Sequence, residues 1–138
     1  MTRDVTTEVV VDGGCSGQRH RTVLRLQWRA ADPLAVSLLL LAEPDHPALP
    51  RGRWAVLRDF LRYGMDHATG DGAVRIRPDT GHTGVLLDLH HAGRVSTVTV
   101  PRPTLVDFLD ATEAIVPAGE ERSDAALDAL IERLLHQT

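Results

Sequence analysis

Two segments, WAVLRDFLRYGM at Trp54–Met65 and PTLVDFLDATEAIV at Pro103–Val116, decide how this sequence folds. Each places apolar residues three or four positions apart, which is the spacing of one face of an α-helix. Each also follows a run of short segments in which apolar and polar residues alternate, as they do in half-buried strands. The sequence therefore predicts an α+β fold of two halves, each a run of antiparallel strands that ends in a helix.

Size and composition are typical of a globular protein. The 138 residues are 43% hydrophobic and carry a net charge of -4, which favours one domain over residues 1–138 and disfavours a general nucleic-acid binder. Cys15 is the only cysteine, which excludes an intramolecular disulfide and a cysteine-rich zinc site. The longest apolar run, Leu38–Ala42, is too short to span a membrane, and the first residues do not resemble a signal peptide. We expect a soluble, cytoplasmic protein.

The first half contains two strands with different patterns. In Arg21–Trp28 the side chains of Leu24, Leu26 and Trp28 share one face, as in a half-buried strand. The segment Leu34–Ala42 is apolar at nearly every position, which predicts a strand buried on both faces, under a helix or in a subunit interface. The candidate residues of such an oligomer interface are Leu34, Val36, Leu38 and Leu40.

The segment from Arg53 to Met65 is ambiguous in its pattern. The residues Trp54, Leu57, Leu61 and Met65 have helical spacing, whereas Trp54, Val56 and Arg58 would share one face of a strand. After it, Ala73–Pro78, Val85–His90 and Val95–Val100 predict a three-stranded meander whose first strand exposes Arg75 and Arg77.

Two helices are predicted after the meander. The first begins at Pro103, buries a stripe of Leu105, Phe108, Leu109, Thr112 and Val116, and leaves Asp107, Asp110 and Glu113 outside. That acidic row is either ordinary solvated surface or a partner-facing stripe. The second helix follows a candidate N-cap at Ser123 and gathers Leu127, Leu130, Ile131, Leu134 and Leu135 on one face. Packing of this face within the domain or oligomer is favoured over an external partner.

Catalytic, metal and cofactor sites are not indicated. Asp88 and His90 would share one face of a strand and His91 the other, which is too few converging ligands for a metal. Cys15 lies in a glycine-rich turn without a neighbouring base, so an ordinary loop residue is favoured over a nucleophile. Gly70 and Gly72 are read as turns, because the pattern of a phosphate-binding loop does not follow them. An enzyme is the least favoured class.

A nucleic-acid interface is the main alternative to a protein-binding role. Arg75 and Arg77, with Arg51 and Arg53, could follow a nucleic-acid backbone. Stacking partners for bases are few, since Tyr63, Trp28 and Trp54 are the candidates and both tryptophans are expected in the core. A solvated basic strand face is therefore favoured.

Four segments, in order along most of the chain, resemble the SsgA-like proteins of sporulating actinobacteria. The first two are Ala31–Val36, similar to the family's ADP-x-AV turn, and Trp54 with Arg58–Leu61 and Gly64, similar to its W…RD-L-L…G segment. The third, Gly70–Pro78, resembles its G-x-G-x-V-x-V-x-P strand. The fourth comprises Phe108–Leu109, Thr112 and Val116–Glu120, similar to FL-x-x-T…VP-x-G-x-E. The chain departs from the commoner pattern at Arg29, Leu34 and Phe60.

The resemblance implies a Whirly-like fold and a bell-shaped trimer. It also implies that the ambiguous segment is a strand to about Leu57 and a helix from about Arg58. The implied role is control of where and when division septa form during sporulation, by contacts with the tubulin-like GTPase FtsZ or with other SsgA-like proteins, at the septum and without catalysis. A Whirly-like single-stranded nucleic-acid binder remains the alternative.

Overall fold

The chain forms one antiparallel sheet with three helices in the part that the computed structural model describes, residues 3–15, 18–41, 52–70, 72–120 and 124–135. The strands are β1 (Asp4–Cys15), β2 (Gln18–Arg29), β3 (Asp32–Leu40), β4 (Gly52–Leu57), β5 (Val74–Pro78), β6 (Gly84–His91) and β7 (Arg94–Pro101). The helices are α1 (Arg58–Gly64), α2 (Arg102–Ile115) and α3 (Asp124–Leu135). The predicted α+β class with antiparallel strands is confirmed.

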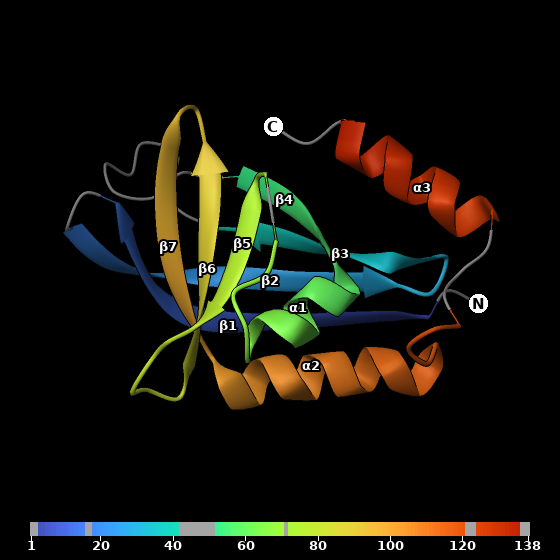
Figure 1. Ribbon diagram of the computed structural model, residues 1–138, viewed down its shortest axis with the longest axis horizontal. Helices are drawn as coiled ribbons and strands as arrows, with labels where there is room; N and C mark the ends of the chain where they lie inside the picture. The colour runs from blue at the N-terminus through green and yellow to red at the C-terminus, as the bar shows by residue number, and fades with distance from the viewer. Residues whose placement is uncertain (1–2, 16–17, 42–51, 71, 121–123, 136–138) are drawn as a thin grey trace.

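The sheet has the strand order β4-β3-β2-β1-β7-β6-β5 and bends sharply in its middle. Whereas β1 pairs with β2 along its whole length, it pairs with β7 only through Asp12, Gly13 and Gly14. We call strands β1–β4 the first half-sheet and β5–β7 the second. In Figure 1 the strands of the second half-sheet run across those of the first, and α1 and α2 lie together at one end.

The core lies between the inner faces of the two half-sheets. Leu24, Leu26 and Trp28 point into it from β2, so the predicted alternation of that strand is confirmed. The second half-sheet supplies fully buried residues from each of its strands: Ile76, Leu87, Leu89, Val98 and Val100. The indole Nε1 of Trp54 donates a hydrogen bond of 2.9 Å to the His90 carbonyl, which ties β4 to β6 across the core.

The ambiguous segment is a strand up to Leu57 and a helix from Arg58, as the family resemblance implies. A single helix, the other possibility, is wrong because β4 pairs with β3 over its whole length and buries Trp54 and Val56 on the inner face. The predicted helix from Pro103 to Val116 is confirmed within one residue at each end. Its Leu105, Phe108, Leu109 and Thr112 are buried as expected.

A buried arginine joins α1 to both the sheet and α2. Arg58 is 1% exposed, and its guanidinium carbon lies 5.4 Å from the centre of the Trp28 ring. Its Nη1 lies 3.4 Å from the Thr112 hydroxyl oxygen on α2. Because a buried guanidinium needs such partners, this contact determines how both helices sit against the sheet.

The last helix lies on the outer face of the first half-sheet, away from α1 and α2 (Figure 1). Arg133 of α3 bonds to the Asp32 carboxylate, with Nη2 2.8 Å from Oδ2, and to the Ser37 hydroxyl. The strand predicted to be buried on both faces, here β3, is therefore covered by a helix on its outer side. The expected N-cap Ser123 lies outside the described residues.

Close packing of α1 on β5 predicts that Gly64 does not tolerate a side chain. An added Cβ would lie 2.4 Å from Cβ and Cγ2 of the buried Ile76. We expect Gly64→Ala to lower the free energy of unfolding by about 1–3 kcal/mol, as overpacked core sites do, measured by urea denaturation. The neighbouring control Tyr63→Ala, at a residue 65% exposed, should change it by less than about 0.5 kcal/mol. Equal effects of the two substitutions would contradict this packing.

A polar network crosses the outer face of the second half-sheet. Arg77 on β5 donates to Asp88 on β6 through Nε, at 2.9 Å from Oδ2, and through Nη2, at 3.2 Å from Oδ1. Thr97 on β7 donates to Oδ1 of the same carboxylate at 2.7 Å. Burial raises the pKa of Asp88, but these hydrogen bonds and the Arg77 charge outweigh burial and hold that pKa below its ordinary value.

The lowered pKa of Asp88 predicts a stability that depends on acid pH. A carboxylate whose pKa is lower in the folded state stabilises the fold above its unfolded pKa of about 4, and this stabilisation is lost as the pH falls through the folded pKa. We expect the free energy of unfolding to fall below about pH 4 and to fall less steeply in Asp88→Asn. Urea titrations from neutral to acid pH measure this difference. Asp107→Asn, at an exposed site on α2, is the control, and parallel profiles for wild type and Asp88→Asn would refute the prediction.

Candidate functional site

The four candidate residues of an oligomer interface on β3 lie mostly inside the molecule. Val36, Leu38 and Leu40 are 0% exposed and face the core, and Leu34 is half-buried. The opposite face of β3, with Ala35 and Ser37, is buried next to α3. In this conformation Leu34 is therefore the one residue of the four with surface available to another chain.

The acidic row on α2 is divided between an internal contact and solvent. Arg62 of α1 bonds through Nη2 to Asp110 at 2.9 Å and to Glu113 at 2.6 Å. Burial lowers the pKa of Arg62, but its bonds to these carboxylates outweigh burial and raise that pKa above the ordinary value. Asp107 is exposed. The row thus joins α1 to α2 at two of its positions and leaves Asp107 available to a partner.

The apolar stripe of α3 is largely uncovered. Exposed fractions are 45% for Leu127, 56% for Ile131, 48% for Leu134 and 77% for Leu135, whereas Leu130 is half-buried. Within the single chain most of this face is therefore not packed on the domain, and the other part of the expectation, packing in an oligomer, stays a prediction. The face is uncovered because α3 meets β3 with the side that carries Arg133, whose ion pair to Asp32 holds the helix in place. We call Leu127, Ile131, Leu134 and Leu135 the α3 stripe.

The basic face of β5 is less open to a nucleic acid than its sequence suggests. Arg77 is engaged with Asp88, and Arg75 is exposed. Arg53 is exposed on β4, in the other half-sheet, and Arg51 lies outside the described residues. Trp28 and Trp54 are each 1% exposed and cannot stack on bases, which leaves Tyr63 of the three candidates.

The residues considered for catalysis or metal binding do not converge in the described part of the chain. Asp88 and His90 lie on the outer face of β6, whereas His91 points inward, its ring centre 6.2 Å from that of Trp54. Cys15 ends β1 and pairs with Gln18 through the backbone. Among the described residues, three or more His, Cys, Asp and Glu side chains do not come together in a way that could hold a metal. Gly70 and Gly72 have φ angles of 105° and 82°, as the predicted turns require.

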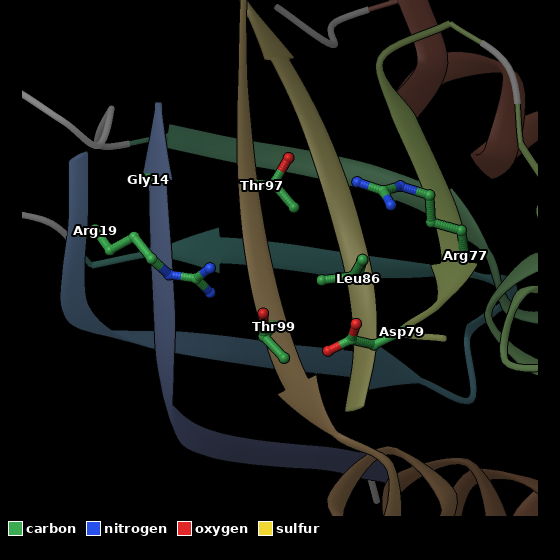
Figure 2. A pocket seen from close by; sticks show the side chains of 7 residues that line it. All are labelled: Gly14, Arg19, Arg77, Asp79, Leu86, Thr97 and Thr99. Atoms are coloured by element: carbon green, nitrogen blue, oxygen red, sulfur yellow. The ribbon is translucent and has the colours of Figure 1, made fainter. Parts of the chain in front are cut away.

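The described surface contains a groove on the outer face of the sheet where its two halves meet. It has a volume of about 460 Å³ and is lined by Gly14, Arg19, Arg77, Asp79, Leu86, Thr97 and Thr99. Figure 2 shows the guanidinium groups of Arg19 and Arg77 entering it from opposite sides, with Thr97 and Thr99 of β7 between them. We call this hollow the junction groove.

Sequence reasoning singled out Arg77 as part of a basic strand face, but it predicted neither the groove nor its other members. Arg19 and Gly14 belong to strands that are separated from Arg77 by about half of the chain. They meet it because β1 pairs with β7, and a pairing of distant strands leaves little mark in the local pattern. The alternation of Thr97 and Thr99 on one face of β7 is the signal that could have been used.

Comparison with known proteins gives a consistent picture. A family model described as Streptomyces sporulation and cell division protein, SsgA, matches residues 23–121. The sporulation-specific cell division protein SsgB of Salinispora tropica is 34% identical over 112 residues, which cover 80% of this chain and 77% of that protein. A sporulation-specific cell division protein of Frankia casuarinae is 29% identical over 123 residues, covering 88% of this chain and 79% of that protein.

Solved structures of the same kind share the fold. One, of SsgB, comes from work on mutations that correlate with longitudinal cell division during sporulation of Streptomyces coelicolor. It is 27% identical, has a TM-score of 0.74 and aligns with 88% of this chain and 94% of its own. Another is the SsgA-like sporulation-specific cell division protein of Thermobifida fusca, 29% identical with a TM-score of 0.72 and 94% of both chains aligned. The chain thus belongs to the SsgA family of sporulation and cell division proteins.

Proposed function

We propose that this protein regulates sporulation-specific cell division by binding other proteins and without catalysing a reaction. The observation that carries the proposal is membership of the SsgA family, whose relatives are named as sporulation-specific cell division proteins. The surface supports it, because the α3 stripe and Asp107 are available for protein contacts. Among the described helices, each is too short or too polar to cross a membrane. The proposed place of action is the cytoplasmic side of the division septum.

The proposed assembly is a homotrimer of single domains, each formed by residues 1–138 with a Whirly-like arrangement of strands and helices. The α3 stripe supports an assembly. Its apolar side chains follow one another at spacings of four, three and one residues, so they lie on one face of the helix, and they are exposed to solvent in the single chain. We place the subunit interface on this stripe, because three of the four β3 candidates are inside the core and the fourth, Leu34, lies by strand alternation on the face of β3 opposite α3.

The assembly proposal predicts that one charge on the stripe separates the subunits. Light scattering should give the wild-type protein a mass of about three times the 15.1 kDa of one chain. Ile131→Asp should reduce it to that of one chain, because an unpaired carboxylate in an apolar interface costs several kcal/mol. Glu132→Gln, on the same helix at an exposed site, should leave the mass unchanged. A single-chain mass for the wild type would refute the assembly.

The partner proposed for the septal role is FtsZ or another SsgA-like protein. Pelleting tests the first branch: purified protein should sediment with polymerising FtsZ, and a fluorescent fusion should collect at sporulation septa. Asp107→Lys is the variant of choice for the α2 surface, since Asp107 is exposed and its replacement leaves the contacts of Arg62 in place. The fusion's failure to reach septa, together with an absence of co-sedimentation, would contradict the role.

A further inference from the structure

The junction groove combines two guanidinium groups with a hydroxyl-bearing floor. Its floor is formed by β6 and β7, which contribute Leu86 and the threonines Thr97 and Thr99. In Figure 2 the Arg19 side chain crosses β1 below the position labelled Gly14 and points toward β7, and the Arg77 side chain extends toward β7 from β5. Because glycine lacks a side chain, Gly14 leaves the path of Arg19 into the groove open. The two guanidinium groups therefore face the same space.

Arg19 is the cation of the groove that has no side-chain partner among the described residues. It is exposed, and among the described residues its guanidinium makes neither a hydrogen bond nor an ion pair. By contrast, the next arginine on that face of β2, Arg21, is paired with Asp12 at 3.3 Å. All of the Arg19 donors are thus available to a ligand, and a planar fork of this kind is suited to a carboxylate.

Arg77 is held rigid by its own partner and still has donors to offer. Its Nε and one N–H of Nη2 are used by Asp88, which leaves three of its five N–H groups. The hydroxyl of Thr97 also donates its hydrogen bond to Asp88 and cannot donate it to a ligand. The hydroxyl of Thr99, in contrast, has no hydrogen-bond partner among the described residues. Within the described part of the chain, a ligand would thus find the unengaged guanidinium of Arg19, the pre-positioned guanidinium of Arg77 and the open hydroxyl of Thr99.

The charges of the groove select the class of ligand. The lining holds Arg19, Arg77 and Asp79. Asp88 pairs with Arg77, so Arg19 and Asp79 are the lining charges left for a ligand, and the exposed Arg75 lies opposite Asp88 on the same face. A polyanion would gain little from such a surface, and the described residues of the lining include no aromatic ring on which a base could stack. A ligand with one acidic and one basic side chain, in contrast, can place its carboxylate at Arg19 and its cation at Asp79.

We propose that the junction groove binds an extended peptide segment of a partner protein that carries an acidic and a basic side chain, with Arg19 as the anchor of the carboxylate and Asp79 as the receptor of the cation. This inference deepens the proposed function and rests on it, since it specifies the kind of segment that a partner presents. Binding by the purified chain tests the groove, and septal localisation of the fusion tests the role. Either can fail while the other holds.

The test uses the full chain and short fluorescent peptides of alanine that are too short to form helices. One set contains a Glu and a Lys separated by one, two or three residues. Matched sets contain two Glu or two Lys, and an oligothymidine of about twelve nucleotides represents nucleic acid. Fluorescence anisotropy measures each affinity at low salt. We expect a Glu/Lys peptide to bind most tightly.

Two substitutions and a control make the expected pattern specific. Arg19→Ala should weaken binding of the Glu/Lys peptide roughly tenfold or more, as loss of a charge-assisted hydrogen bond does. Asp79→Asn should abolish the preference for Glu/Lys over Glu/Glu peptides, because it removes the negative charge at one end of the groove. Arg21→Ala, on the same strand face but outside the groove lining, should bind as the wild type does. Thermal unfolding should show that all three variants are folded.

Three results would overturn the proposal. The first is wild-type affinity in Arg19→Ala, the second is a failure of every peptide to bind, and the third is oligothymidine binding that exceeds peptide binding and depends on Arg19. The third would assign the groove to single-stranded nucleic acid.

Discussion

The junction of β1 with β7, through three residue pairs, is the constraint on which the rest of this structure depends. So short a ladder cannot by itself hold two half-sheets at a fixed angle, so their relative position must come from the core between them. Trp54 contributes most visibly, because its ring is buried and its Nε1 bonds to a carbonyl on the opposite half-sheet. The same junction creates the concave outer surface that becomes the junction groove.

The residues that carry the family resemblance are mainly those that build this scaffold. Pro33 accepts the Trp28 indole hydrogen bond, Arg58 joins the sheet to both adjacent helices, and Gly64 allows α1 to approach Ile76. Their chemistry explains the shared shape of SsgA-family proteins, but it does not select a partner. The exposed groups proposed above for partner binding, Asp107, Arg19 and the α3 stripe, lie outside the resembling segments or on their solvent side.

Local pattern was sufficient for most of the strands and for α2, because alternation and helical spacing are set by burial on one face. Local pattern was insufficient where contacts between residues distant in the sequence determine the structure. Pattern could not place the change from β4 to α1 at Leu57, which depends on pairing with β3, and the resemblance was needed to resolve it. Likewise the pattern makes Val36, Leu38 and Leu40 candidates for an interface, whereas in the structure they belong to the hydrophobic core of the chain. The groove was missed because it joins residues of β1 and β2 to residues of the second half-sheet, which are distant in the sequence.

Native-state hydrogen exchange tests the central claim, that one core holds both half-sheets together. If it does, the most slowly exchanging amide groups of the two half-sheets must have the same free energy of opening and the same dependence on denaturant. These amides are expected at Leu24 and Leu26 of β2 and at Leu87 and Leu89 of β6. Trp54→Phe should lower both by the same amount, since it removes the bond that crosses the core. Exchange of β6 at a distinctly lower free energy than β2 in the wild type would show two separate units and contradict the account.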